Sequence, residues 1–200
     1  MAKLPNSFYH RDDVVQISKD LLGKVLCTNI NGEFTSGMIV ETEAYRGAED
    51  RASHAWNLRR TNRTEIMFGP GGVAYVYLCY GIHHLFNVVT NVPEIPHAVL
   101  IRAIEPLQGI DKMAERRNVA ANKTRLTSGP GVASKALGIE VPHTGQSLKG
   151  STIWIEGDGQ EVSTKEIIAS PRVGVDYAKE HAALPWRFRI KGNKWCSPAK

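Results

Sequence analysis

The sequence predicts an α+β fold in which one antiparallel β-sheet carries a few helices. Strand-like segments come mostly in pairs joined by turn signals, rather than alternating with helices, which favours antiparallel hairpins. Asn31-Gly32 between two such segments is the strongest of these signals. The chain has 200 residues, of which 42% are hydrophobic, enough for one sizeable core. Because no repeat, low-complexity tract or linker divides it, residues 1–200 are expected to form a single domain.

The first third of the chain is expected to hold a helix, a hairpin and a loop. Apolar residues at helical spacing predict a helix over residues 14–22, which Gly23 ends. The strands of the first hairpin are expected at residues 24–30 and 33–43. Residues 46–64 are polar and rich in Arg and Asn, which predicts a loop, and loops on a rigid scaffold often carry function.

A second hairpin follows a turn forced by the glycines and the proline of residues 68–72. Its strands are expected at residues 73–79 and 85–91. Tyr80-Gly81 then falls near the tip, where a side chain can protrude from the sheet.

The rest of the chain predicts a buried strand followed by alternating short elements. Residues 98–104 form a continuous apolar run, interrupted by Arg102, which is typical of a strand buried on both faces. A helix is expected over residues 110–118, and Pro130 opens another that ends at Gly138. The last elements expected are strands at 153–155 and 166–168, a helix over 177–182 and a strand at 187–190.

The formal net charge of +5 is moderate, but the basic residues are unevenly distributed. Clustered cations favour a polyanionic partner, although net charge alone does not establish one. The two clusters contain Arg51, Arg59, Arg60 and Arg63 in the first, and Lys112, Arg116, Arg117, Lys123 and Arg125 in the second.

The cysteines and the N-terminus predict an intracellular protein. The three cysteines are scattered, with neither a disulfide framework nor a zinc spacing, as expected for free thiols in a reducing compartment. The first residues lack the apolar segment of a signal peptide. The longest apolar run, residues 73–82, is too short to span a bilayer. We therefore expect a protein of the cytoplasm, nucleoid or nucleus, without a membrane partner.

The segment 40–45 suggests chemistry. As a strand it places Glu41, Glu43 and Tyr45 on one face. Two carboxylates on one strand face are costly to bury, and by themselves they are best explained by pairing with Arg side chains or backbone N–H groups. However, several tyrosines, Asn87 and Arg102 follow along the chain. Together these side chains could stack a flat ring and direct a water molecule at it.

These residues, taken in order, resemble the alkyladenine (3-methylpurine) DNA glycosylase family from about residue 8 to residue 198. The resemblance implies a curved antiparallel sheet with surrounding helices and a protruding hairpin that inserts into DNA. It also implies an enzyme that excises alkylated and deaminated purines from duplex DNA without a metal or cofactor. The matching segments are Glu43-Ala44-Tyr45, His54, Tyr77, Tyr80-Gly81, Asn87, Arg102, Ser128-Gly129-Pro130, Arg172-Val173-Gly174-Val175 and Pro185-Trp186-Arg187-Phe188.

The resemblance assigns the chemical roles. Glu43 would stabilise the oxocarbenium character of the sugar and take a proton from the attacking water. Periodicity alone does not choose between Glu41 and Glu43, because both project to one face. Arg102 would orient the same water and favour the charged form of Glu43. By resemblance, the backbone carbonyl of Val173 is a third holder of the water. A buried structural pair of Arg102 and Glu43 is compatible with the same sequence.

The remaining site residues would recognise the base. By resemblance, Tyr45, His54 and Tyr77 wall the pocket that takes the flipped base. Tyr80 would plug the gap left in the duplex, although an ordinary tyrosine on an apolar strand would pack in the core. Asn87 would crowd the place where guanine carries its 2-amino group, while a buried Asn that satisfies backbone groups is the alternative.

Two other functions compete with a monofunctional glycosylase acting as a monomer on double-stranded DNA with damaged purines, and a metal site is rejected. A non-catalytic nucleic-acid-binding domain of the same fold would lack the carboxylate, yet Glu43 is present. A lyase that forms a Lys Schiff base is weaker, because the matching segments contain no lysine. His83-His84 could suggest a metal site, but adjacent residues point apart and no third ligand has suitable spacing. Departures such as Arg46 and residues 82–86 leave the preferred lesion open.

Overall fold

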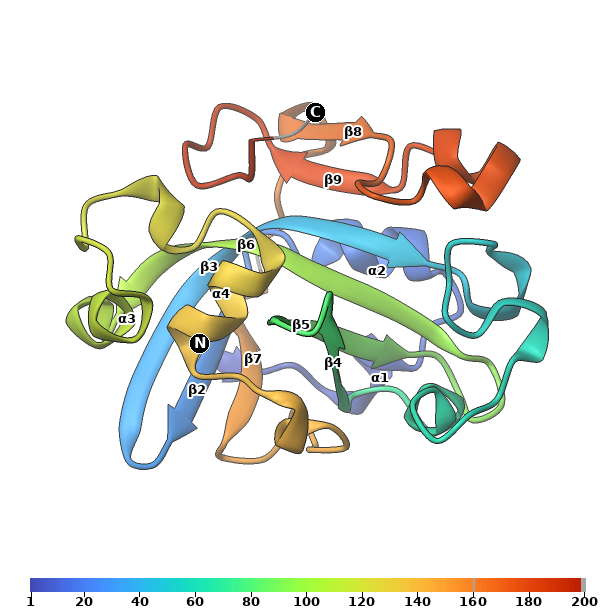
Figure 1. Ribbon diagram of the computed structural model, residues 1–200, viewed down its shortest axis with the longest axis horizontal. Coiled ribbons are helices and arrows are strands. Elements are labelled where there is room, and N and C mark those ends of the chain that lie inside the picture. Colours follow the sequence, from blue (N-terminus) through green and yellow to red (C-terminus); the bar gives the residue numbers. More distant parts are fainter. Residues whose placement is uncertain (160, 199–200) are drawn as a thin grey trace.

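The computed structural model of the protein describes residues 1–159 and 161–198. In this part of the chain nine strands form one sheet, and every strand pair in it is antiparallel. The strands are β1 (Ala2–Lys3), β2 (Val25–Ile30), β3 (Glu33–Tyr45), β4 (Ala74–Cys79), β5 (His83–Thr90), β6 (His97–Gln108), β7 (Ile153–Gly157), β8 (Ile167–Ser170) and β9 (Arg187–Ile190). Their order is β1-β7-β2-β3-β6-β5-β4, with β9 between β3 and β8 (Figure 1).

Within the described residues, four α-helices and several 3₁₀ turns surround the sheet. In Figure 1, α4 lies in front of the sheet and α2 lies behind it. The Asp13 side chain caps α2 by accepting the N–H of Gln16 at 2.9 Å, and Pro130 opens α4. The α-helices are α1 (Asn6–Tyr9), α2 (Val14–Asp20), α3 (Ile110–Arg117) and α4 (Pro130–Leu137). The 3₁₀ turns are η1 (Gly47–Glu49), η2 (Trp56–Leu58), η3 (Glu65–Phe68), η4 (Thr124–Leu126), η5 (Val141–His143), η6 (Thr164–Glu166) and η7 (Asp176–Ala183).

The long strands β3 and β6 form the centre of the sheet and give it a curved shape. On one edge β3 pairs with β6, while its other edge pairs first with β2 and then with β9. The β3–β6 register shifts on both sides of Glu41, and the shifts leave Val40 and Arg102 without a partner in the register. Such bulges bend a strand and change the direction of nearby side chains. They lie at the point where the first candidate side chains meet.

The predicted α+β class with an antiparallel sheet is confirmed, and both predicted hairpins are present. The helix predicted over 177–182 is wrong in type, because residues Asp176–Ala183 form 3₁₀ turns interrupted at Lys179, whose φ is 54°. Strands β3 and β6 run further than predicted, since pairing with long neighbours outweighs local composition. Strand β1 and helix α1 have four residues or fewer and were not predicted, because so short a segment carries little periodicity.

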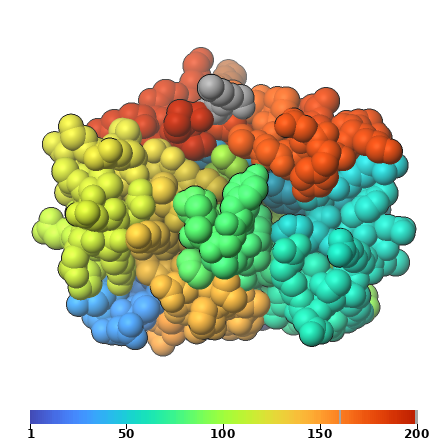
Figure 2. Space-filling view, in the orientation of Figure 1, coloured from blue at the N-terminus to red at the C-terminus, as the bar shows by residue number. Residues whose placement is uncertain are grey.

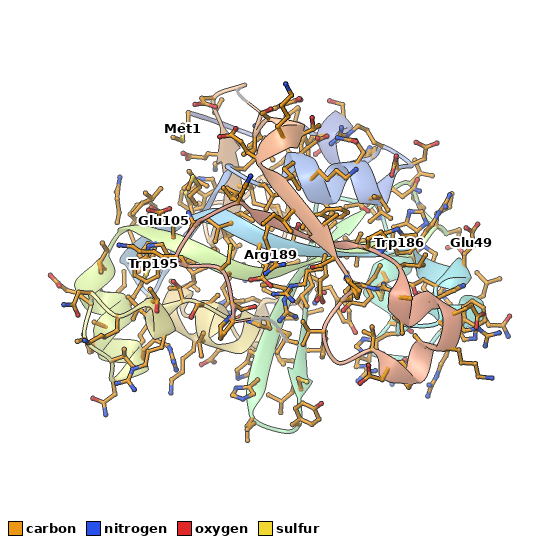
Figure 3. The ribbon with its side chains drawn as sticks, turned by 90° about the horizontal axis from the view of Figure 1, so that it is seen from above. Met1, Glu49, Glu105, Trp186, Arg189 and Trp195 are labelled. Atoms are coloured by element: carbon orange, nitrogen blue, oxygen red, sulfur yellow. The ribbon has the colours of Figure 1, made fainter. Side chains whose placement is uncertain are left out.

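Two groups of buried side chains hold the hairpin of β4 and β5 at the edge of the sheet. One face of the hairpin, with Val76 and Phe86, joins the main core, to which α2 and α4 contribute. The other face, with Tyr75 and Val89, packs on a smaller cluster that includes Phe68. Seen from above in Figure 3, the pale green hairpin projects beyond the body of the molecule. The two faces of the hairpin therefore have different surroundings.

Candidate active site

Glu43 is the centre of the candidate site. Its side chain, on β3, is fully buried, yet it lines the cavity described below. Oε1 accepts the backbone N–H of Val173 at 2.8 Å and lies 3.2 Å from Nη1 of Arg102, while Oε2 accepts the Tyr45 hydroxyl at 2.8 Å. A carboxylate held by three donors at the wall of a cavity is fixed in position, and its charge can still act on a bound molecule.

Glu41, the other carboxylate of this strand face, has a different environment. It accepts Nε of Arg102 at 2.8 Å, Nε of Arg187 at 2.7 Å, the Ser197 hydroxyl at 2.8 Å and the Ser197 backbone N–H. Burial opposes ionisation, but Arg102, the N–H of Ser197 and Arg187 together hold the pKa of Glu41 below its ordinary value. Since protein donors surround it and the cavity lining does not include it, its geometry is that of a structural ion pair.

Arg102 links the two carboxylates. It lies in β6 with 7% of its surface exposed, and its fork reaches Glu41 through Nε and Glu43 through Nη1. The bulge described above leaves Arg102 out of the β3–β6 register, opposite the two carboxylates. Arg102 therefore forms a buried ion pair and also lies beside Glu43, so the two interpretations of this residue are compatible.

A cavity of about 430 Å³ opens beside Glu43, within the range of small-molecule sites. Figure 2 shows the surface hollowed between the green hairpin, the cyan loop and the orange C-terminal segment. The rings of His54 and Tyr77 meet edge to face with centroids 4.6 Å apart, and Tyr75 lies 5.5 Å from Tyr77. Tyr45 lines the cavity near Glu43. Of these four side chains, Tyr75 was not singled out in the sequence.

His54 forms part of this wall as a neutral ring. Its Nδ1 lies 2.8 Å from the Tyr75 hydroxyl. Burial, and then the positive charges of Arg63 and Arg59, lower the pKa of His54 to about 4. At neutral pH the wall therefore carries no charge at His54, and its nitrogens can accept or donate hydrogen bonds.

Asn87 lies on β5, where its side chain is almost fully buried and lines the cavity. Its Nδ2 donates to the carbonyls of Tyr75 at 3.1 Å and Leu85 at 3.2 Å. The side chain thus satisfies two backbone acceptors, as the simpler interpretation of the sequence predicted. The same bonds hold the amide at the cavity wall, where the family role would require it.

Tyr80 occupies the tip of the β4–β5 hairpin and is 89% exposed. The tip is a tight turn in which Tyr80 and Gly81 both have positive φ, 52° and 72°, and the N–H of Ile82 donates to the carbonyl of Cys79 at 3.1 Å. A bulky residue in this conformation costs roughly 1–2 kcal/mol. Because the ring is not packed in the core, the turn holds an aromatic side chain in solvent at some cost, which points to a role in binding.

Comparison with known proteins identifies the family of the chain. The family model described as Methylpurine-DNA glycosylase (MPG) matches residues 7–194. The chain is 49% identical over 193 residues to a protein of Chlamydia felis named "Putative 3-methyladenine DNA glycosylase", covering 96% of this chain and 97% of the relative. Proteins of the same name from Natranaerobius thermophilus and Clostridium acetobutylicum are 45% and 47% identical, covering 98% and 99% of this chain and 98% of each relative. The chain belongs to the methylpurine-DNA glycosylase family.

Membership in the methylpurine-DNA glycosylase family confirms the resemblance inferred from the sequence and the prediction of a DNA N-glycosylase. The structure brings Glu43, Tyr45, Tyr77, Asn87 and Arg102 to one cavity, and the same cavity is lined by His54, Tyr80 and Val173. The backbone N–H of Val173 donates to Glu43, a contact that the family resemblance did not mention, since it assigned the Val173 carbonyl to the attacking water. The role of that carbonyl remains a prediction.

The sequence did not indicate the residues that fix the walls of this methylpurine-DNA glycosylase site in position. Arg172, fully buried beside Val173, pairs with the buried Asp50 and donates to the carbonyl of Ala44 at 2.8 Å. Its guanidinium carbon lies 4.8 Å from the centroid of the Tyr45 ring. This pair ties the segment that carries Val173 to strand β3. Arg172 belongs to a family motif, which was the available signal, whereas nothing near Asp50 or Ser197 in the sequence indicated a partner.

Neither a metal centre nor a membrane-spanning helix occurs in the described ranges, 1–159 and 161–198. No group of three or more His, Cys, Asp or Glu side chains there is placed to hold a metal ion. No helix there is long and apolar enough to cross a bilayer. His84 accepts the backbone N–H of Val141 at 3.1 Å, and Gly131 allows His83 to pack closely against α4. Both histidines thus contribute to packing around the hairpin.

Proposed function

We propose that the protein is a monofunctional DNA glycosylase that initiates base excision repair. It flips alkylated or deaminated purines out of duplex DNA and hydrolyses the N-glycosidic bond with a water molecule activated by Glu43. The observation that carries this proposal is a fully buried carboxylate, fixed by three donors, at the wall of an aromatic cavity beneath an exposed tyrosine. The names of the relatives, which specify 3-methyladenine, support a damaged purine as substrate.

The chemistry follows from charge. As the glycosidic bond breaks, positive charge develops on the sugar, and the nearby carboxylate of Glu43 stabilises it. Glu43 also accepts a proton from the water that attacks the sugar carbon. The fork of Arg102 lies beside the carboxylate and can orient the same water. The purine leaves with the bonding electron pair, and the enzyme forms no covalent bond to the sugar.

The cavity walls suit a flat and electron-poor base. Tyr45, Tyr77 and the neutral ring of His54 offer faces and edges on which a purine can stack, at about 1–3 kcal/mol per base. A purine that carries a positive charge after alkylation gains a further cation–π attraction to the tyrosines. Flipping leaves a gap in the duplex, and the exposed ring of Tyr80 is placed to fill it.

The product of the reaction tests this proposal. Duplexes that contain 3-methyladenine, 7-methylguanine, hypoxanthine or ethenoadenine opposite their normal partner are incubated with the protein in EDTA. We expect a free base and an abasic strand that breaks only after alkali treatment. Strand scission without alkali, or trapping of the protein on DNA by borohydride, would indicate a Schiff-base lyase instead. Binding without any base release would indicate a non-catalytic DNA-binding domain.

A second experiment tests flipping separately from chemistry. Tyr80→Ser should reduce excision from a duplex by roughly tenfold or more, because the vacated stack loses its plug. The same variant should excise the base from a single strand at the rate of the wild-type protein. Phe34→Ser is the matched control. It removes an exposed aromatic ring at the start of β3, away from Glu43 and Tyr45 at the end of the same strand. Equal excision by Tyr80→Ser and the control on duplex DNA would refute the wedge.

A further inference from the structure

A second pocket, of about 730 Å³, lies on the other face of the β4–β5 hairpin. The hairpin contributes Leu78, Cys79 and Tyr80 to the base cavity and Ile82, His83 and His84 to this second pocket. Its opposite wall comes from α3 and α4, which carry Arg116, Arg117 and Lys135. In Figure 2 the green hairpin stands between the yellow segment of α3 and α4 and the cyan loop. We call this second pocket the basic groove.

The cations of the basic groove are held in place by neutral groups. Nη1 of Arg116 donates to the carbonyl of Ala136 at 3.0 Å. Nε of Arg117 donates to the carbonyl of Leu126 at 3.2 Å, and its Nη2 donates to the carbonyl of Arg125 at 3.3 Å. Within the described residues, neither guanidinium has a carboxylate at ion-pair distance. Because carbonyls orient these side chains without neutralising them, their positive charge remains available to a ligand.

Several other members of the two basic clusters already have anionic partners. Arg60 contacts Glu65 and Glu94 at 2.8 Å each, and Arg51 contacts Glu180 at 2.8 Å. Lys112, on the same helix as Arg116, lies 3.1 Å from Glu115 and 3.4 Å from Glu33. A phosphate would have to displace these carboxylates, whereas Arg116 and Arg117 need no such exchange. The structure therefore separates paired from unpaired cations within clusters whose members the sequence could not tell apart.

The basic groove keeps a fixed position relative to the hairpin tip. A Cβ atom on Gly131 would lie 2.9 Å from the Cβ of His83, so only glycine lets α4 approach β5 this closely. His84 is tied to the N–H of Val141 at 3.1 Å. Pro130 lines the base cavity while Gly131 and Val132 line the basic groove. The N-terminus of α4 thus sits between the two pockets and holds them in register with Tyr80.

We propose that the basic groove binds the sugar–phosphate backbone of the DNA strand opposite the lesion. This inference rests on the proposed function, in which Tyr80 fills the gap left by the flipped base; side chains that wedge between base steps in this way enter from the minor groove. A hairpin in the minor groove faces one strand on each side. The strand that delivers the purine must pass the base cavity, so the complementary strand passes the basic groove. The guanidinium groups and Lys135 bind its phosphates, while Ile82 and Val132 provide apolar contacts for deoxyribose.

The test combines a protein variant with neutral DNA linkages. Lys135→Gln is the primary variant, because Lys135 is exposed and we expect its substitution to leave the fold intact. Arg117→Gln is the second variant, and Lys112→Gln is the matched control on α3. Binding is measured on duplexes with an abasic analogue at the lesion position. These duplexes carry methylphosphonates in the complementary strand, in the lesion strand or in neither.

We expect Lys135→Gln and Arg117→Gln each to weaken binding by about three- to tenfold near 0.1 M salt and to flatten the log–log salt slope by about 0.9 unit. Methylphosphonates in the complementary strand should weaken wild-type binding but cause little further loss in these variants, because both changes remove one contact. Methylphosphonates in the lesion strand should cause the same loss in all proteins. Lys112→Gln should match the wild type.

Two outcomes would overturn the assignment. If both variants bind every duplex as the wild type does, the groove contacts no phosphate. If their losses are non-additive with lesion-strand rather than complementary-strand methylphosphonates, the groove holds the lesion strand. A failure of the proposed function is recognised separately, because then the wild-type protein would release no base from a damaged duplex.

Discussion

Two carboxylates on one strand face, both fully buried and both in contact with Arg102, have different surroundings. Glu41 is enclosed by two guanidinium groups and by the N–H and hydroxyl of Ser197. Glu43 contacts one guanidinium group, one backbone N–H and one hydroxyl, and it borders a cavity of about 430 Å³. The two side chains are thus equally buried, but only Glu43 is accessible to a molecule in the cavity.

The comparison shows what separates a structural carboxylate from a reactive one. Glu41 accepts hydrogen bonds from donors on three segments of the chain. These ion pairs and hydrogen bonds hold β3, β6 and β9 together. Glu43 contacts only one charged donor within the described ranges, Arg102, and its carboxylate borders the cavity. It can therefore interact with a molecule bound there. Arg102 serves both, and it keeps one carboxylate when the other is removed. The two residues should therefore respond to the same substitution in opposite ways.

The largest effect is expected for Glu43→Gln. Excision should fall by roughly a hundred- to ten-thousandfold, because the amide neither accepts the proton nor carries negative charge. The free energy of unfolding should change by about 1 kcal/mol or less, since Arg102 keeps Glu41 as its counter-ion. Single-turnover excision and urea unfolding measure the two quantities. Turnover within tenfold of the wild type would show that Glu43 is the wrong carboxylate.

Glu41→Gln should show the reverse pattern. Removing this charge leaves Arg187, which is 1% exposed, with no carboxylate in contact among the described residues. Loss of one partner of a buried ion pair typically costs about 3–5 kcal/mol of unfolding free energy. Excision per folded molecule should stay within about tenfold of the wild type. A stable Glu41→Gln protein that has lost excision would exchange the roles of the two residues.

The cavity wall, through His54, and the buried ion pair, through Glu41, should contribute to the stability of the fold over different ranges of pH. The pKa of His54 is lowered to about 4 in the cavity wall, so between its ordinary value of 6.5 and about 4 the unfolded chain binds a proton that the folded protein refuses. Stability should therefore fall by about 3 kcal/mol as the pH drops through this window. The contribution of Glu41, whose folded pKa is lowered, is present above its ordinary value of 4.5 and is lost only as the pH falls further.

Urea unfolding of the wild type and of His54→Gln at pH values from about 8 to 4 isolates the first window. The variant should lack this part of the pH dependence, while the dependence from other groups, such as the buried His97, stays the same in both proteins. If the free energy of unfolding varies with pH in the same way for both proteins, then the folded protein protonates His54 as readily as the unfolded chain does.

A smaller effect is expected from Asn87→Ser at the far wall of the cavity. A shorter side chain opens room for an exocyclic 2-amino group, so guanine-derived lesions should gain on hypoxanthine by about 1–3 kcal/mol in the ratio of specificity constants. Asn91→Ser is the matched control, because Asn91 is also buried and hydrogen-bonded but does not line the cavity. The variant also loses two hydrogen bonds to backbone, so its melting temperature is measured first. An unchanged ratio in the folded variant would leave Asn87 with a structural role alone.

The smallest effect is expected from Tyr45→Phe, which removes the hydroxyl donor of Glu43. One hydrogen bond to a charged group contributes about 1.5–3 kcal/mol at most, and the remaining donors of Glu43 reduce that loss. Excision should therefore fall by about tenfold, measured under single-turnover conditions. Tyr75→Phe is the control, because it removes a hydroxyl bonded to His54 instead. If Tyr45→Phe matches its control, the hydroxyl does not tune Glu43.

Features that depend on local interactions were mostly predicted correctly from the sequence, whereas features that depend on contacts between distant residues were not. Turn chemistry is local, so Asn31-Gly32 and Tyr80-Gly81 located both hairpin tips correctly. Strand alternation is also local, and Glu41, Glu43 and Tyr45 do gather on one side of β3. The helix predicted over 177–182 was wrong, because periodicity over a few residues does not distinguish an α-helix from consecutive 3₁₀ turns. Charge clustering likewise indicated cations without showing which are neutralised.

The sequence by itself determined the fold class, the hairpin tips and, through resemblance, the family and the residues worth testing. Only the tertiary structure showed how the surroundings of Glu41 and Glu43 differ, and which cations are paired with carboxylates and which are not. The physical reason is that a side chain's chemistry depends on its partners in space. Ser197 lies 156 residues from Glu41 along the chain, and Val173 lies 130 residues from Glu43. Contacts at such separations leave no periodic trace in the sequence, and they arise when the sheet brings β3, β6 and β9 together.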